Sequence, residues 1–172
     1  VVYDSGVERI AQHAKNLDIP IIADPKLTGL HRTHDVDWII FQSRGFELMK
    51  RRIGEGDDSV AAKSLLESYG WKHLVVLAGG NGVTIYSKSD NTVHAACTLP
   101  QLRQVIGLID AAVVAIAVSI SNGFSVSDTA LLTNAACECI LSAQATDSFS
   151  LNKDMLIHRV GEIAWNLQVS KR

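Results

Sequence analysis

One apolar stretch, Gln104 to Gly123, limits what this chain can fold into more than any other segment. It begins with a turn at Val105-Ile106-Gly107 and then carries a single charge, Asp110, among apolar residues. A helix with so little polar surface must be buried, so the pattern predicts a central core helix. Asn122-Gly123 predicts its end, with a left-handed cap.

Asp110 lies in the first turn of this predicted helix, where the positive end of the helix dipole favours a carboxylate. Two interpretations follow. In the first, Asp110 only stabilises the end of the helix. In the second, it is a base that faces a site where free backbone N–H groups hold a phosphate. From these residues alone the first interpretation is favoured, because charged groups at helix ends are common and catalytic ones are rare.

Length and charge exclude several classes of protein. With 172 residues the chain can form one domain with a substantial core, and its net charge of -2 argues against nucleic acid or an anionic membrane as a partner. No apolar run is long enough to span a bilayer, since Ala111 to Ile120 is too short. The start at Val1 lacks both Met and a basic segment, so we expect no signal peptide there.

The cysteines indicate a reducing compartment. Three are present, and their spacing forms neither a disulfide framework nor a zinc pattern. Cys137 and Cys139 are two positions apart on a predicted helix and therefore point in different directions. We predict a cytoplasmic protein without a metal site. His31 and His34 form H-R-T-H in a polar loop, and a solvated loop is favoured there over metal binding because no further ligand stands at a recognisable spacing.

Strands and helices alternate along the chain. Ser59 is the expected cap of one helix, with Val60 and Leu65 on its buried side, and Leu131 is expected on the packed side of a later helix. The predicted strands are Val1–Tyr3, Ile19–Ala23, Trp38–Phe41, His73–Leu77, Val83–Tyr86 and Thr92–Cys97. The other predicted helices are Gly6–Leu17, Ser43–Arg52, Ser59–Tyr69, Ser127–Ala143 and one within Ser150–Gln168.

This alternation predicts one α/β domain over residues 1–172, with a three-layer α/β/α architecture, an open and mostly parallel sheet, and an antiparallel hairpin at its edge. Ligands of such sheets bind at the carboxyl ends of the strands. That rule places Asp4, Asp24, the segment from Phe41 to Arg44, the turn from Gly79 to Gly82 and the start of the Gly107 helix at one common edge.

Six segments, in order, resemble the second half of the ribokinase-like (PfkB) carbohydrate kinases. They read D-S-G, I-P-I-I-A-D-P-K, D-W-I-I-F-Q-S-R-G-F-E-L, L-V-V-L-A-G-G-N-G-V-T-I-Y, Q-V-I-G-L-I-D-A-A-V-V-A-I-A and L-L-T-N-A-A. Within that family the chain looks most like the sugar-kinase domain of bifunctional ADP-heptose synthases. The resemblance implies a ribokinase-like fold whose N-terminal half is missing here.

The resemblance also implies catalytic roles. The family motif D-x-T-G-A-G-D, whose glycines bind the transferred phosphate and whose last Asp takes the proton of the sugar hydroxyl, corresponds to Gln104 through Asp110. Asp110 is then the base, and Gly107 is the remaining glycine of the anion hole. Leu108 and Ile109 replace small residues, and side chains there would obstruct the close approach of backbone to phosphate.

Other motifs of the family are matched in part. The segment that resembles T-P-N-x-x-E has Phe46 in place of the carboxylate that helps to hold magnesium, and Glu47 comes one position late, about 100° further round the helix. The nucleotide turn retains Gly79 and Gly82, and Asn134 matches the helix that lines the adenine site. Asp24-Pro25-Lys26 also matches, with ligand contact and a strand-ending loop equally favoured.

Two functions are compatible with these residues. The first is a sugar kinase domain that uses ATP and Mg²⁺ on a sugar or sugar phosphate, incomplete and with weakened motifs, since losing anion-hole donors and a magnesium carboxylate removes much of the electrostatic stabilisation of phosphoryl transfer. The second is an inactive module of the same fold with a structural or protein-interaction role. An unpaired strand at Val1 would favour a protein partner or a homo-oligomer.

Overall fold

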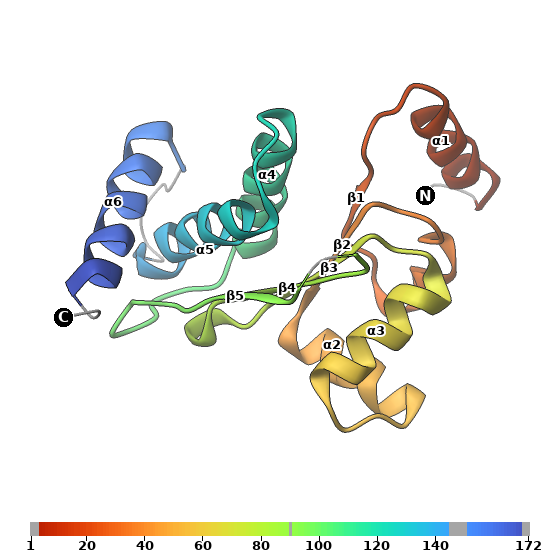
Figure 1. Ribbon diagram of the computed structural model, residues 1–172, viewed down its shortest axis with the longest axis horizontal. Coiled ribbons are helices and arrows are strands. Elements are labelled where there is room, and N and C mark those ends of the chain that lie inside the picture. The colour runs from red at the N-terminus through yellow and green to blue at the C-terminus, as the bar shows by residue number, and fades with distance from the viewer. Residues whose placement is uncertain (1–3, 90, 145–150, 170–172) are drawn as a thin grey trace. The chain divides into compact units, whose positions relative to one another are not determined.

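The structure is a computed structural model, and it describes residues 4–89, 91–144 and 151–169 (Figure 1). The strands are β1 (Ile22–Ala23), β2 (Trp38–Gln42), β3 (His73–Leu77), β4 (Val83–Ser87) and β5 (Val93–Ala95). The α-helices are α1 (Asp4–Asn16), α2 (Ser43–Ile53), α3 (Asp58–Tyr69), α4 (Leu108–Ser121), α5 (Val126–Ser142) and α6 (Lys153–Val169). Two short 3₁₀ helices are η1 (Leu27–Arg32) and η2 (Gly79–Asn81).

The described strands form one sheet in the order β1-β2-β3-β4-β5. β1 is parallel to β2, with Ile22 opposite Trp38. β3 and β4 form an antiparallel hairpin, since the Lys88 N–H donates to the Lys72 carbonyl at 2.9 Å at its base and the tip closes at the turn that joins the strands. The predicted α/β class, with its antiparallel hairpin, is confirmed.

The chain divides into two compact units. Unit 1 comprises Val1–Val76 and Ile85–Thr92, and unit 2 comprises Leu77–Thr84 and Val93–Arg172. Each unit is described below by itself.

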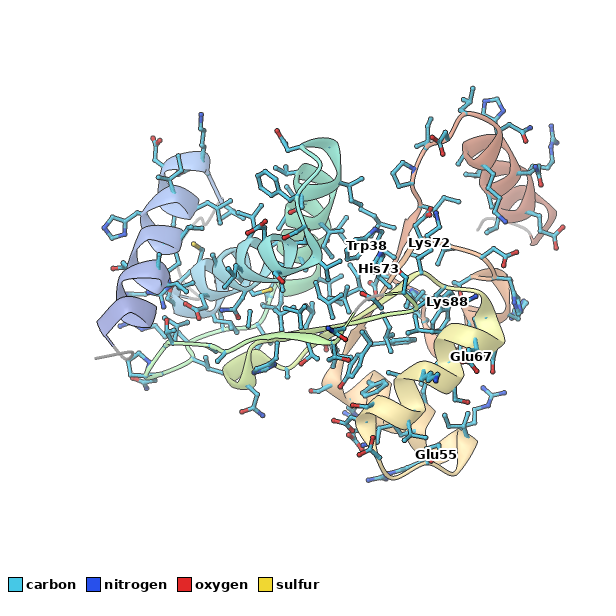
Figure 2. All side chains as sticks on the ribbon, viewed as in Figure 1. Trp38, Glu55, Glu67, Lys72, His73 and Lys88 are labelled. Atoms are coloured by element: carbon cyan, nitrogen blue, oxygen red, sulfur yellow. The ribbon has the colours of Figure 1, made fainter. Side chains whose placement is uncertain are left out.

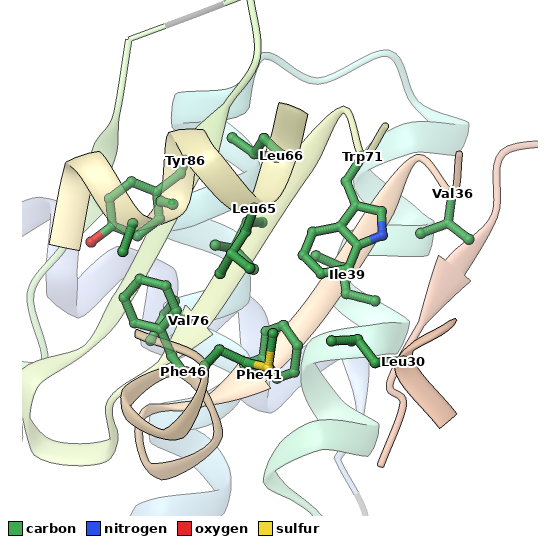
Figure 3. Packing of buried hydrophobic residues seen from close by; sticks show 14 residues of the cluster. Leu30, Val36, Ile39, Phe41, Phe46, Leu65, Leu66, Trp71, Val76 and Tyr86 are labelled. Carbon is green, nitrogen blue, oxygen red and sulfur yellow. The ribbon is translucent and has the colours of Figure 1, made fainter. Parts of the chain in front are cut away.

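In unit 1 the core lies between α2, α3 and one face of β2 and β3 (Figure 3). Ile39 and Phe41 alternate along β2, and Leu74 and Val76 alternate along β3, so each strand presents every second side chain to this core. Ile40, between the two core residues of β2, is also fully buried, and both faces of that strand are therefore covered. Strands buried on both faces explain the continuous apolar runs in the sequence.

Trp71, immediately before β3, anchors the same core. Its side chain is completely buried, its indole N–H donates to the Thr33 carbonyl at 2.6 Å, and its ring stacks on Tyr69 at 4.6 Å. The hydrogen bond satisfies the only polar atom of the indole, which makes full burial of this large ring favourable.

The ends of the unit 1 helices differ in part from the prediction. The cap of α3 is Asp57, whose Oδ1 accepts from the N–H groups of Ser59 and Val60 at 2.8 and 3.0 Å, so the predicted Ser59 cap is wrong. A carboxylate accepts both N–H groups more strongly than a hydroxyl does, and this fixes the helix start before Ser59. Val60 is 51% exposed, which contradicts its predicted place on the buried side. Gly54 ends α2 in the left-handed conformation.

In unit 2, α4 packs on α5 through small side chains. Ala111 and Ala115 of α4 meet Ala136 and Ile140 of α5, and the three alanines let the two helices approach closely. The prediction that α4 is buried all round is wrong, because Val114 is 56% exposed and Val118 is also exposed. A helix that is apolar on every face carries no signal for which face packs, and contact with α5 selects only one.

Two further expectations concern α5 and the edge of the sheet. Leu131 is exposed rather than packed, because α5 turns Ala130 and Thr133 inward instead. β1 is shorter than predicted, since only Ile22 and Ala23 pair with β2. The predicted strand at residues 1–3 lies outside the described residues. Among the described helices none is long and apolar enough to cross a membrane.

Replacing Leu65 by Ala tests which face of α3 forms the core. Leu65 is almost fully buried in the unit 1 core, so we expect the free energy of unfolding to fall by about 2–5 kcal/mol in urea denaturation. Val60→Ala on the same helix is the matched control and should change it by less than about 0.5 kcal/mol. Equal losses for the two variants would contradict the described packing.

Candidate functional site

The turn between β3 and β4 depends on glycine. The Ala78 N–H donates to the Gly82 carbonyl at 2.9 Å, which closes the turn over η2. Gly82 has φ 88° and ψ -149°, a conformation that only glycine adopts readily, and a Cβ there would collide with the Ala95 carbonyl and lie 2.8 Å from the Cys97 nitrogen. Backbone of the segment after β4 therefore packs directly on this turn.

One apolar side chain covers part of the same turn. Leu102 Cδ1 lies 3.8 Å from the position of a Cβ on Gly79 and 3.3 Å from that of a Cβ on Gly80. Leu102 itself is 40% exposed, so it forms an apolar wall beside the two glycines while remaining open to solvent on its other side. The glycines allow this contact because they have no side chains of their own.

The start of α4 is the second part of the candidate site. Gly107 is its N-cap with φ 84°, and the Gly107 carbonyl accepts the first helical hydrogen bond from the Ala111 N–H at 3.0 Å. Leu108, the first residue of the helix, is buried, whereas Ile109 is half-buried. Ile106, before the cap, is 80% exposed.

Asp110 lies in the first turn of α4 with its side chain exposed. Within the residues that the structure describes, no side chain pairs with its carboxylate. A carboxylate at this end of a helix is stabilised by the dipole and by the free N–H groups beside it. The arrangement leaves the Asp110 oxygens accessible to accept a proton or to contact a bound molecule.

Asn134, on α5, is almost fully buried. Its side-chain amide donates to the Ala96 carbonyl and to Glu138 Oε1, each at 3.0 Å. Asn134 thus holds the same segment, residues 95 to 97, on which Gly82 packs. The glycine turn and Asn134 therefore both contact this segment and lie close to each other. Because the amide is engaged there, its described role is to position backbone.

Glu138, which the sequence analysis did not single out, is the most enclosed charged group of unit 2. Its side chain is completely buried, and its carboxylate accepts from the Thr98 N–H at 2.6 Å and from Arg159 Nε at 2.6 Å. Arg159 Nη2 also pairs with Glu138 and donates to Thr98 Oγ1 at 2.8 Å, while Arg159 Nη1 donates to Glu162 at 2.7 Å.

The segment that resembles the magnesium motif has a different role in unit 1. Phe46 is buried in the core, with its ring 5.8 Å from that of Tyr86. The neighbouring Glu47 Oε1 accepts from Lys50 Nζ at 3.1 Å, and Lys50 also pairs with Asp58. Neither position offers an unpaired carboxylate, so this segment does not fit a magnesium ligand set.

Asp24-Pro25-Lys26 follows β1 and borders a groove of about 390 Å³ between α1 and η1. Its walls are mostly apolar, with Val7, Ile21 and Val36 among them. Asp24 and Lys26 are exposed at its rim. The motif therefore lies at the carboxyl end of β1, as predicted.

Cysteine and histidine form no metal centre in the described ranges, where no three side chains of His, Cys, Asp or Glu are grouped closely enough to hold a metal ion. Burial raises the pKa of the Cys137 thiol to about 12, with the charge of Glu138 as a second cause. Cys137 is therefore protonated at neutral pH, and a protonated thiol is neither a nucleophile nor a metal ligand.

A polar cluster in unit 1 was also missed. The rings of Trp38 and His73 stack at 4.0 Å, and His73 Nδ1 lies 2.9 Å from Ser87 Oγ. Figure 2 labels Trp38 and His73 next to each other. Lys72 Nζ pairs with Asp37 at 2.6 Å beside them. These residues meet across three strands, so no local sequence pattern identifies the cluster.

Comparison with known proteins agrees with this architecture. A variant of phosphofructokinase-2 from Escherichia coli superposes with a TM-score of 0.79 at 15% identity, over 95% of this chain and 53% of that chain. Ribokinase from Arabidopsis thaliana, solved with ribose and ATP, gives a TM-score of 0.77 at 16% identity, over 92% and 53%. No protein-family model matches the chain. The chain has the ribokinase-like α/β fold.

A more particular similarity comes from sequence. Over 145 residues the chain is 23% identical to the bifunctional protein HldE of Aliivibrio fischeri, an alignment that covers 84% of this chain and 30% of that protein. The resemblance drawn from the six motifs, to ribokinase-like kinases and to the HldE sequences in particular, is confirmed. The chain spans less than a third of the length of HldE and about half the length of the structural relatives.

Alanine at each of two glycines tests the site geometry. Gly107→Ala places a methyl group in open space and forces an L-residue into φ 84°, so we expect it to cost about 1–2 kcal/mol of stability. Gly82→Ala adds a collision with the Ala95 carbonyl, and we expect more than about 3 kcal/mol. Urea denaturation measures both, and a Gly82 variant as stable as the Gly107 variant would contradict the described turn.

The buried Cys137 thiol predicts a specific dependence of stability on pH. Its pKa is raised from an ordinary value near 9 to about 12, so the unfolded chain loses this proton first, and the stability present below pH 9 is lost as pH rises toward 12. Between pH 8 and 10.5 we expect the difference in unfolding free energy between the native chain and Cys137→Ala to shrink by about 2 kcal/mol. Parallel pH profiles would show that Cys137 is not buried as described.

Proposed function

We propose that this chain is the nucleotide-binding part of a ribokinase-like carbohydrate kinase, with a phosphoryl-transfer site weaker than that of its relatives. The nucleotide is ATP, and the acceptor is a sugar or sugar phosphate. One observation carries the proposal. The glycine turn of η2, Asn134 and the start of α4 all belong to unit 2, and the turn and Asn134 are fixed on the same backbone segment, residues 95 to 97.

Backbone supplies most of the proposed nucleotide contact. Gly79 and Gly80 carry no side chains that would keep a ligand away from the turn, and Leu102 gives it an apolar wall. Small-molecule sites are mostly apolar surfaces with a few placed polar groups, which matches this combination. Gly82 keeps the turn in place but lies against Ala95, so its role is to shape the site.

Asp110 is the proposed proton acceptor. Its exposed carboxylate stands beside the first N–H groups of α4, and such groups bind anions. A phosphate near Gly107 would lie close to a base that can accept the proton of an attacking hydroxyl. This pairing of anion-binding backbone with a carboxylate supports phosphoryl transfer rather than nucleotide storage.

The position expected to help hold magnesium lacks a carboxylate in this chain. Phosphoryl transfer depends on positioning and electrostatic stabilisation, to which bound Mg²⁺ contributes. At the position of the family carboxylate this chain has Phe46 in its core, and Glu47 is paired with Lys50. A single lost electrostatic contact of this kind costs about 3–4 kcal/mol in the transition state. We therefore expect the chain to bind ATP but to transfer its phosphate slowly.

That expectation defines the second candidate, an inactive kinase-fold module with a structural or protein-interaction role. The observation in its favour is again Phe46, because a buried aromatic ring stabilises the fold and contributes nothing to phosphate chemistry. A module of this kind would bind a protein partner or a second copy through an open sheet edge. β1 is the first strand in the described order.

Calorimetric titration with ATP and Mg²⁺ tests the proposal. We expect millimolar or tighter binding, reduced at least tenfold by Gly79→Val, because valine fills the turn and is strained at φ 55°. Asp110→Asn should leave a folded protein that retains nucleotide binding but transfers no phosphate to a sugar acceptor. Gly29→Ala is the matched control, since a methyl group there meets nothing within 4 Å.

The two candidates separate on the same measurements. Binding with slow, Asp110-dependent phosphorylation supports the kinase. Binding without turnover, measured on a chain extended to the length of the structural relatives, supports the module, as does a stable protein complex. No binding by a folded chain of full family length would contradict the proposal.

A further inference from the structure

The segment between β5 and α4 is held to unit 2 at defined points. We call residues 96 to 103 the strap. The Ala96 carbonyl accepts from Asn134, the Thr98 N–H donates to Glu138, and the Arg103 N–H donates to the Leu141 carbonyl at 2.8 Å. All of these partners lie on α5, so one helix fixes both ends of the strap.

Glu138 is the central member of this arrangement. It is completely buried, and both of its oxygens are used, Oε1 by Thr98 and Asn134, and Oε2 by Thr98 and Arg159. Removing a carboxylate from water is costly unless charged and neutral donors replace the water. The arrangement satisfies that condition, and Arg159 of α6 supplies the compensating charge.

The strap carries Leu102 onto the glycine turn. Leu102 lies between the two points at which α5 holds the strap. Thr98, which bonds to Glu138, comes shortly before it, and Arg103, which bonds to Leu141, comes directly after it. Leu102 reaches to 3.3 Å from the Cβ position on Gly80. The two attachments on α5 therefore determine where this apolar wall stands relative to the turn.

We infer that Glu138, charge-balanced by Arg159, is a positioning residue that holds the strap against the glycine turn and so pre-forms the wall of the nucleotide site. This role rests on the proposed nucleotide binding. Glu138 touches no ligand in this account. It acts through the Thr98 N–H, and Arg159 acts by balancing the charge of Glu138 and by orienting its carboxylate. A pre-formed wall reduces the ordering that binding would otherwise require.

Two double variants test whether the oxygens of residue 138, which accept from Thr98 and Asn134, hold the strap. Glu138→Leu with Arg159→Met replaces the buried pair by apolar side chains, which is often tolerated, and removes the acceptor of the Thr98 N–H. Glu138→Gln with Arg159→Met keeps an amide oxygen for Thr98 and Asn134, without an unpaired charge. Glu162→Gln is the matched control, because it removes the charge of the outer partner of Arg159, which also lies near His158, and leaves Glu138 in place.

Hydrogen exchange and methyl NMR measure, in the absence of nucleotide, whether the strap is held against α5 and the glycine turn. In the Leu/Met variant we expect the Thr98 amide to exchange at least tenfold faster and the contacts between the Leu102 methyl groups and Gly79 or Gly80 to be lost. The Gln/Met variant and Glu162→Gln should retain both. A folded Leu/Met variant with a protected Thr98 amide and intact Leu102 contacts would overturn the inference.

Nucleotide titration then separates this inference from the proposed function. We expect the Leu/Met variant to bind ATP with Mg²⁺ at least fivefold more weakly than the Gln/Met variant at similar Tm. Equal affinities, with the strap released, would overturn the positioning role. If the unmodified chain binds no ATP, the proposed function and the role of Glu138 in nucleotide binding both fail. The exchange and methyl data still decide whether Glu138 holds the strap.

Discussion

A carboxylate removed from water organises unit 2. Glu138 is completely buried, and a lone charge in that position would be strongly unfavourable, so the fold must bring donors to it. Thr98 and Asn134 provide N–H groups, and Arg159 provides the opposite charge. Each donor comes from a different part of the chain, and satisfying one group therefore fixes α5, α6 and the strap together. The strap that Glu138 holds carries Leu102, which lies beside the candidate nucleotide turn.

Two positions that the sequence resemblance aligns with catalytic motifs are buried in this structure. Phe46 packs among aromatic side chains of unit 1, and Leu108 is buried at the start of α4. A buried aromatic ring adds apolar surface to the core and offers no ligand to magnesium or phosphate. Asp110 and the glycine turn show the opposite pattern, because the carboxylate is exposed and Gly79 and Gly80 leave bare backbone beside Leu102. Both features fit the ligand contact that we propose for them.

Local patterns predicted much of this fold. Alternating apolar runs identify β2 and β3, and glycine marks the tight turn before β4. The same reasoning did not identify which face of a helix packs on its neighbours. Val60 of α3 and Leu131 of α5 are apolar and were predicted to be packed, but both are exposed.

Glu138 escaped prediction for a different reason. Its partners Thr98 and Arg159 lie 40 and 21 residues away in sequence, and only tertiary structure joins them. One signal was present, a single acidic residue between Cys137 and Cys139 in an apolar helix.

The central claim is that backbone of the glycine turn, walled by the strap, forms a nucleotide site within unit 2. Amide chemical-shift mapping with ATP and Mg²⁺ tests it most directly. The account predicts saturable shifts confined to residues 79 to 82, the strap and the first turn of α4, with unit 1 positions such as Trp71 unchanged. Saturable shifts that leave the glycine turn and the strap unaffected would contradict it.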